Sequence, residues 1–223
     1  MSVQENLQRI ETKIENALQK TNRSRSDLVL IGVTKYVSNE RAQEAIDAGI
    51  LNLGENRAEE LIYKYEDIKS NANWHFIGTL QSRKVKDVID KVSAIHSLDR
   101  LSIVKQINKR SSKVMDCFVQ VNVSGETTKH GLKKEEVIPF IESLAGYDKV
   151  RVAGLMTMAP DSDDEEEIRQ VFRSLRELRD EAAAKHLAHA PCHFLSMGMS
   201  NDFQIAIEEG ATHLRLGSQL VGS

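Results

Sequence analysis

Short hydrophobic segments alternate with amphipathic ones along almost the whole chain. Eight segments rich in Val, Ile, Leu and Phe have the length and composition of buried strands. They span Leu28–Lys35, Leu51–Asn56, Trp74–Gly78, Ala94–Leu98, Asp116–Val123, Val150–Met156, His193–Gly198 and His213–Gly217. Between them, apolar residues recur at a spacing of three and four, as in Ile168, Val171, Phe172 and Leu175, which predicts helices with one buried face.

The spacing of these segments predicts a (β/α)8 TIM barrel. Seven steps separate Lys35 from Gly217, so one step averages about 26 residues, which suits a strand, a turn and a helix. Eight such strands favour a closed barrel, and an open doubly wound sheet is the alternative. The amphipathic run from Val3 to Leu18 predicts a further helix. Since too little sequence follows the eighth strand to form a helix, we expect this N-terminal helix to complete the outer ring.

Composition and charge predict an ordinary folded domain. No Pro, Gly or Ser-rich linker divides residues 1–223, so we expect a single domain, and 40% of its residues are hydrophobic. A net charge of -3 gives no general attraction to nucleic acid or anionic lipid. The N-terminus does not resemble a signal peptide, and the longest apolar run, Leu28–Val33, is too short to cross a bilayer. We therefore expect a cytoplasmic monomer without nucleic-acid or membrane partners.

Cysteines and histidines in this sequence predict no redox or metal site. Cys117 and Cys192 form no C-x-x-C pair and are expected to be reduced core thiols. His186, His189 and His193 have a spacing that a metal can use. No cysteine or carboxylate completes a tetrahedral set with them, so we expect no metal.

Polar residues at the strand ends predict a binding site, because the C-terminal ends of barrel strands meet at one face. Lys35 follows an apolar strand, and we expect its amine to lie in a low-dielectric pocket, where desolvation makes an amine nucleophilic toward carbonyl groups. The alternative for Lys35 is a lysine that extends from a strand end into solvent.

Two turns near the C-terminus suit an anion. Ser196–Asp202 leads from a strand into a helix and exposes amides that bind phosphate or, alternatively, only cap the helix. Gly217 and Ser218 supply a second set of amides nearby. Arg215 shares a strand face with Gly217 and is expected to project into the barrel. An amine, a phosphate cradle and an inward arginine together fit pyridoxal 5′-phosphate (PLP).

Six motifs occur in the order of one protein family. They are Gly32-Val33-Thr34-Lys35, Gly54-Glu55-Asn56, His75-Phe76-Ile77-Gly78, Gly154-Leu155-Met156, Ser196-Met197-Gly198-Met199-Ser200 and Arg215-Leu216-Gly217-Ser218. On these motifs, the sequence resembles the pyridoxal phosphate homeostasis protein family, whose barrel is similar to the N-terminal domain of alanine racemase. Two positions depart from the family pattern, at Arg83, where Asn is usual, and at Val221, where Phe is usual.

The resemblance implies a set of residues in contact with PLP, which are Lys35, Asn56, His75, Met156, Ser200, Arg215, Gly217 and Ser218. Within this set, it implies that Lys35 is the Schiff-base lysine and that Arg215 neighbours the pyridine nitrogen. Three members are implied as phosphate ligands, namely Ser200, Gly217 and Ser218, and the others line the ring. A lysine of the loop Ser124–Leu132, Lys129, resembles a family element on the route to the pocket; an ordinary solvated lysine is the alternative.

The resemblance implies a non-catalytic carrier that takes part in intracellular PLP homeostasis, with PLP-dependent apoenzymes as candidate partners. The alternative is a PLP-dependent amino-acid racemase, which needs acid-base groups on both faces of its substrate. In the alanine racemase arrangement, the second base is a tyrosine from an additional domain, and only Tyr36 lies near the predicted site here. A metal-dependent barrel hydrolase is disfavoured, since Glu55 is its only well-placed carboxylate.

Overall fold

A computed structural model describes residues 1–126 and 129–222 of the chain, which form a closed parallel barrel. Its strands are β1 (Val29–Val33), β2 (Asn52–Glu55), β3 (Asn73–Phe76), β4 (Ala94–Leu98), β5 (Met115–Gln120), β6 (Val150–Met156), β7 (Phe194–Ser196) and β8 (His213–Leu216). Each strand pairs in parallel with its neighbours in sequence, and β8 pairs with β1. The predicted (β/α)8 barrel is confirmed, and the open doubly wound sheet is wrong because the last strand pairs with the first.

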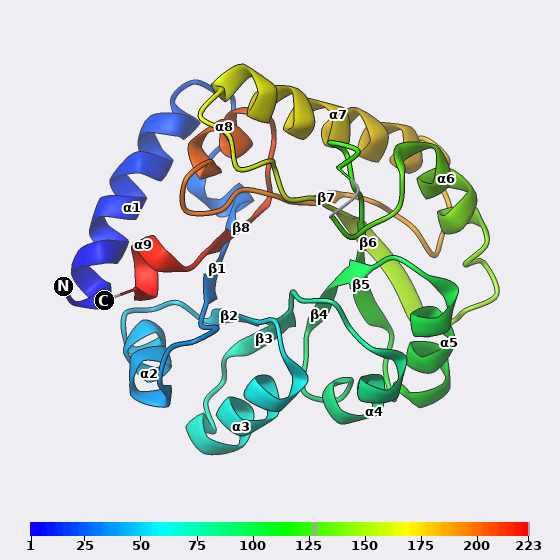
Figure 1. Cartoon of the computed structure of the whole chain (residues 1–223), viewed down its shortest axis with the longest axis horizontal. Helices are drawn as coiled ribbons and strands as arrows, with labels where there is room; N and C mark the ends of the chain where they lie inside the picture. The colour runs from blue at the N-terminus through cyan, green and yellow to red at the C-terminus, as the bar shows by residue number, and fades with distance from the viewer. Residues whose placement is uncertain (127–128, 223) are drawn as a thin grey trace.

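Helices surround the barrel as a ring (Figure 1). In the described residues they are α1 (Val3–Leu18), α2 (Asn39–Asp47), α3 (Ala58–Ile68), α4 (Val85–Val88), α5 (Leu101–Arg110), α6 (Lys134–Glu142), α7 (Glu165–Ala183), α8 (Phe203–Glu208) and α9 (Ser218–Val221). Two 3-10 turns accompany them, η1 (Arg25–Asp27) and η2 (Ser82–Lys84). None of these helices combines the length and apolar character needed to span a membrane.

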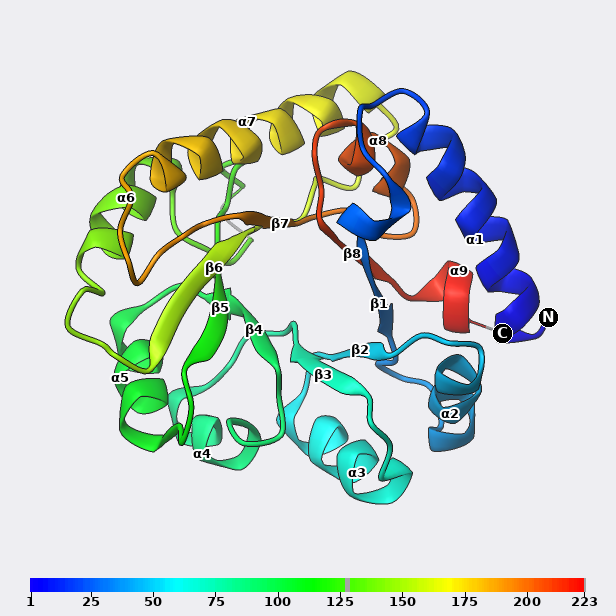
Figure 2. The same cartoon turned by 180° about the vertical axis from the view of Figure 1, so that it is seen from behind.

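The N-terminal helix α1 takes its predicted place in the outer ring. Ser2 caps it in a capping box with Glu5, and its buried stripe includes Ile10 and Ile14. Figure 2 shows α1 beside α8 and α9, against which it packs. The expectation that no helix follows β8 is wrong, because Ser218–Val221 forms one helical turn beneath α1.

The inside of the barrel is partly polar. The rings of His75, His96 and His213 lie 5.1 to 6.5 Å apart, and Phe118 stacks on His96 at 4.2 Å. These side chains come from strands that are not all neighbours, so they meet inside the barrel. Burial lowers the pKa of His75 to about 4 and that of His213 to about 3, and it lowers the pKa of His96 well below its ordinary value.

We expect these three histidines to make the free energy of unfolding fall by about 4 kcal/mol between pH 7.5 and pH 5.5. Each is neutral in the folded state but has a pKa of about 6.5 when unfolded, which corresponds to about 1.4 kcal/mol per histidine at pH 5.5. Because the folded-state pKa is depressed, this stability is present above the unfolded pKa and is lost as the pH falls below it.

Urea unfolding at the two pH values measures this effect. The variant His213→Phe should lose about one third of the decrease. The variant His193→Asn changes an exposed histidine and should retain all of it. A decrease below about 1 kcal/mol in the unsubstituted protein would contradict burial of the three rings as neutral groups.

Candidate functional site

A cavity of about 910 Å³ opens at the C-terminal ends of the strands. Its wall contains six of the eight residues predicted to contact a cofactor, which are Lys35, Asn56, Ser200, Arg215, Gly217 and Ser218. The two others, His75 and Met156, are buried in the barrel interior and do not belong to this wall. Contact of each residue with a cofactor remains a prediction, but the fold brings the six together from β1, β2, β7 and β8.

Lys35 lies at the open mouth of the cavity, just beyond β1. Its side chain is exposed, so it does not have the low-dielectric surroundings that we expected from the apolar strand before it. The next residue, Tyr36, is also exposed and has a left-handed backbone with a φ of 67°. The Lys35 ammonium lies 5.6 Å from the centre of the Tyr36 ring, and the guanidinium of Arg57 lies 5.5 Å from it.

A buried ion pair holds the strand end that precedes Lys35. The Lys64 ammonium donates to Glu55 Oε1 at 2.7 Å and to the carbonyl oxygen of Thr34 at 2.6 Å. The Thr34 hydroxyl donates to the same Glu55 oxygen at 2.7 Å. Lys64 and Glu55 are 1% and 0% exposed, so the pair is buried, and Glu55 Oε1 receives both donors while Oε2 has no partner among the described residues. The ion pair thus ties α3 and β2 to the residue next to Lys35.

Sequence reasoning missed Lys64, although a signal was present. Lys64 follows Ala58 and Leu61 at successive spacings of three, and all three residues are buried on α3. A lysine on the apolar face of a helix needs an acceptor. Glu55, nine residues earlier, was the nearest strand-end carboxylate in the sequence.

Close backbone approach places Asn56 in the cavity wall. A Cβ atom on Gly78 would collide with the carbonyl oxygen of Asn56, so only glycine allows β2 and β3 to approach here. The side-chain oxygen Oδ1 of Asn56 is buried and accepts no hydrogen bond from the described residues.

Arg215 lines the cavity from β8, and its guanidinium is held on two sides. Nη1 donates to the hydroxyl of Ser196 at 2.6 Å, and Nη2 donates to the carbonyl oxygen of Thr157 at 2.9 Å. Burial lowers the pKa of Arg215 to about 10, an effect that the charge of Asp202 opposes. The guanidinium therefore keeps its positive charge at neutral pH.

Two turns bring main-chain amides to the same side of the cavity. The amide of Gln219 donates to the Ser200 hydroxyl at 3.4 Å, which joins the turn before α8 to the start of α9. Among the described residues, the amides of Ser200, Gly217 and Ser218 donate to no protein acceptor. These donors, with the charge of Arg215 nearby, suit an anionic group.

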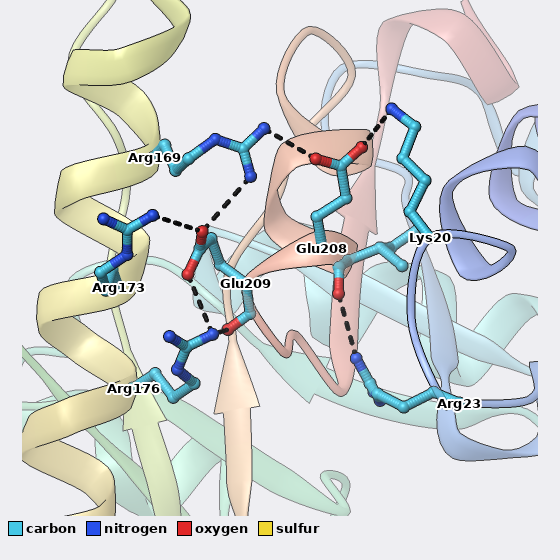
Figure 3. Close-up of polar contacts among 8 residues, drawn as sticks. Lys20, Arg23, Arg169, Arg173, Arg176, Glu208 and Glu209 are labelled. Atoms are coloured by element: carbon cyan, nitrogen blue, oxygen red, sulfur yellow. Dashed lines mark hydrogen bonds and ion pairs between the residues drawn. The ribbon is translucent and has the colours of Figure 1, made fainter.

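Charged side chains at the C-terminal end of α8 join this helix to its neighbours (Figure 3). The carboxylate of Glu209 is buried and lies 2.9 to 3.3 Å from three arginines of α7, namely Arg169, Arg173 and Arg176. Glu208 pairs with Arg169 and with Lys20, both at 2.7 Å. These pairs join α8, which directly follows the Ser200 turn, to α7 and to the segment after α1.

Other residues considered in the sequence lie outside the cavity wall. Lys129 pairs with Glu126 at 2.6 Å, and its loop includes residues 127–128, which lie outside the described residues. Arg83 is exposed and donates to Gln81 at 3.0 Å. Cys117 and Cys192 are buried and unpaired, as expected for core thiols. In residues 1–126 and 129–222, no group of three or more His, Cys, Asp or Glu side chains is arranged to hold a metal.

The wall also contains residues that the sequence did not single out. Gln120 ends β5, Thr79 follows β3, and His130 lies in the loop after β5. An acidic segment after β6 lines the outer part of the cavity through Asp161 and Asp163. In the sequence these acids directly precede the acidic first turn of α7, and nothing there indicates a cavity.

Comparison with known proteins gives the family of the chain. The model of the alanine racemase N-terminal domain matches residues 6–223. The pyridoxal phosphate homeostasis protein of Aquifex aeolicus is 42% identical over 226 residues, which cover all of this chain and 98% of that protein. The chain belongs to the pyridoxal phosphate homeostasis protein family. This confirms the resemblance that the six sequence motifs indicated.

Two solved structures illustrate the structural similarity of this chain to known proteins. PipY of Synechococcus elongatus, solved with PLP bound, has a TM-score of 0.85 at 26% identity and covers 99% of this chain and 100% of its own. An alanine racemase of Clostridium difficile has a TM-score of 0.76 at 16% identity. The match covers 98% of this chain and 56% of the racemase, so it shows a shared fold alone.

Breaking the buried ion pair should destabilise the fold strongly. We expect Lys64→Met to lower the free energy of unfolding by about 3 to 5 kcal/mol, because Glu55 is left buried without its counter-charge. Urea unfolding of the purified variant measures the loss. Lys84 is a matched control, since it pairs with Glu59 at the surface, and Lys84→Met should cost less than about 1 kcal/mol. Equal losses in the two variants would show that burial does not decide the strength of the pair.

Proposed function

We propose that this chain binds PLP in the strand-end cavity and takes part in intracellular PLP homeostasis without catalytic turnover. The arrangement that supports this most directly is the placement of Lys35, Arg215 and the free amides of the Ser200 and Gly217 turns on one cavity wall. The family to which the chain belongs, and the PLP bound in PipY, point to the same cofactor.

The residues present fit this cofactor. Two cationic side chains, Lys35 and Arg215, offset the negative charge of the phosphate group. Unpaired amide donors suit its oxygens, and the cavity is larger than the cofactor requires. Ser200, Gly217 and Ser218 would hold the phosphate, and the unpartnered Oδ1 of Asn56 offers an acceptor. His75 and Met156 are buried in the barrel interior, and they would support the residues at the floor of the cavity.

Lys35 and Arg215 have different tasks in this proposal. PLP, when bound, supplies an aldehyde that condenses with primary amines and a ring that withdraws electrons. The Lys35 amine is exposed at the mouth, and it would form the covalent link to the protein. Arg215 keeps its charge at neutral pH, so it would oppose protonation of a ring nitrogen beside it.

The described part of the cavity wall contains no tyrosine that would act as the second base of an alanine racemase-like reaction. Exchange of a proton on both faces of a substrate requires two opposed acid-base groups. Lys35 is one such group, but the described wall contains no tyrosine, and the Tyr36 ring is 70% exposed beside the mouth. Our proposal also includes that the protein is a cytoplasmic monomer that exchanges PLP with PLP-dependent apoenzymes.

Borohydride treatment of PLP-loaded protein tests the binding site. We expect a pyridoxyl group on Lys35, detected by peptide mapping, because reduction makes the covalent link permanent. Lys35→Ala should lose the label, whereas Lys129→Ala, which changes another lysine near the cavity, should retain it. A label on Lys129 or Lys84 in the unsubstituted protein would contradict the role proposed for Lys35.

Solvent deuterium exchange tests the proposed absence of turnover. We expect D- and L-alanine to exchange their Cα hydrogen more slowly than about 1 s⁻¹, the lower edge of ordinary enzyme rates, since the described wall offers no tyrosine for the second face of the substrate. Mass spectrometry and chiral chromatography in heavy water measure exchange and inversion, with Lys35→Ala as the background. Inversion with deuterium incorporation at or above that rate would establish a racemase instead.

A further inference from the structure

A line of hydrogen bonds crosses the barrel from the cavity to the opposite rim. Its members, in order, are Arg215, Ser196, His96, His75 and Asn52. The Ser196 hydroxyl contacts Arg215 Nη1 at 2.6 Å and His96 Nδ1 at 2.8 Å. His96 Nε2 contacts His75 Nδ1 at 3.0 Å, and His75 Nε2 contacts Asn52 Oδ1 at 3.1 Å. The four members from Arg215 to His75 are buried, and Asn52 begins β2 at the far end.

The chemistry of Arg215 sets the direction of this line. A guanidinium only donates hydrogen bonds, so the Ser196 oxygen must accept from it. Within the described residues, the Ser196 hydroxyl has one other partner, His96 Nδ1, and a fully buried hydroxyl proton needs an acceptor. Ser196 therefore donates to His96.

The same reasoning continues through both rings. Because Nδ1 of His96 accepts, its neutral ring carries the proton on Nε2 and donates to His75 Nδ1. His75 then carries its proton on Nε2 and donates to the Asn52 oxygen, which can only accept. The reverse direction would leave the Ser196 proton without a partner. The Ser196 hydroxyl and both rings have acceptors for their protons only when the line runs from Arg215 to Asn52.

The line does not conduct protons to the cavity. Arg215 at its end stays protonated at neutral pH, and burial beside that charge disfavours a second cation on His96. What the line does is restrict the guanidinium, because Ser196 and the carbonyl oxygen of Thr157 take its two terminal nitrogens. The hydrogen bond between Ser196 and His96 Nδ1 fixes the orientation of the Ser196 hydroxyl.

We propose that Ser196 and His96 are positioning residues for Arg215, and that the line locks His96 and His75 as neutral rings protonated on Nε2. Neither residue belongs to the cavity wall, so each acts through Arg215. The part of this inference that concerns PLP affinity rests on the function proposed above, whereas the state of the rings and the order of Arg215 do not.

Nitrogen-15 NMR of the full chain without ligand tests the ring states at neutral pH. Two-bond correlations in protein labelled at histidine distinguish a ring protonated on Nε2 from one protonated on Nδ1. We expect the first pattern for both His75 and His96. A ring protonated on Nδ1, or on both nitrogens, at either position would overturn the assigned direction.

Hindered rotation of the Arg215 guanidinium tests the positioning role without PLP. We expect separate, ordered Nη signals in the unsubstituted protein, averaged signals in Ser196→Ala and ordered signals in Ser196→Thr, which keeps the hydroxyl. Unfolding measurements on both variants identify any loss of the fold. Ordered signals in a folded Ser196→Ala protein would overturn the role of Ser196.

A double-mutant cycle on PLP binding tests whether Ser196 acts through Arg215. Loss of one hydrogen bond to a charged group should weaken binding about tenfold in Ser196→Ala. In an Arg215→Met background, the same change should have no further effect. An equal loss in that background would overturn the proposal. Failure of the unsubstituted protein to bind PLP would instead reject the proposed function, and the NMR measurements would then decide this inference alone.

Discussion

Pairing of the last strand with the first is the constraint on which the site depends. In the register of β1 and β8, Ile31 lies opposite Arg215 and Gly32 lies opposite Leu216. Lys35, which follows β1, and Ser218, which follows β8, are therefore brought to the same rim. A shift of one residue would turn the Arg215 side chain away from the barrel interior, because side chains alternate along a strand.

Support for the cavity comes from charges buried on two sides of the barrel. The pair of Lys64 and Glu55 holds the end of β1, and the arginines of α7 hold Glu209 at the end of α8. Both sets consist of residues outside the cavity wall, so they do not occupy the polar atoms that face a ligand. Rigid elements thus carry the residues that face the ligand, while the mouth at Lys35 stays open to solvent.

Periodicity and strand-end residues made the barrel and much of the cavity wall predictable. Lys35, Arg215 and the two amide-rich turns were recognised because parallel strands present their C-terminal ends together. Lys64 and the line of His96 and His75 were not recognised, since their partners lie 9 to 100 residues away and depend on the three-dimensional arrangement. The exposure of Lys35 was also missed, because the apolar strand before it does not reveal that the buried residues end at Thr34.

The closed sheet also has a consequence for synthesis of the protein. Lys35 leaves the ribosome long before Arg215 and Ser218 do, because most of the barrel lies between them in the sequence. Strand β1 has one open edge until β8 arrives, and pairing of segments so distant in sequence is slow compared with local folding. A nascent chain therefore has the amine of the cavity but not its anion-binding side. Ligand binding of the kind proposed above therefore requires that β8 has been made and has paired with β1, so the cavity distinguishes chains that contain β8 from shorter fragments.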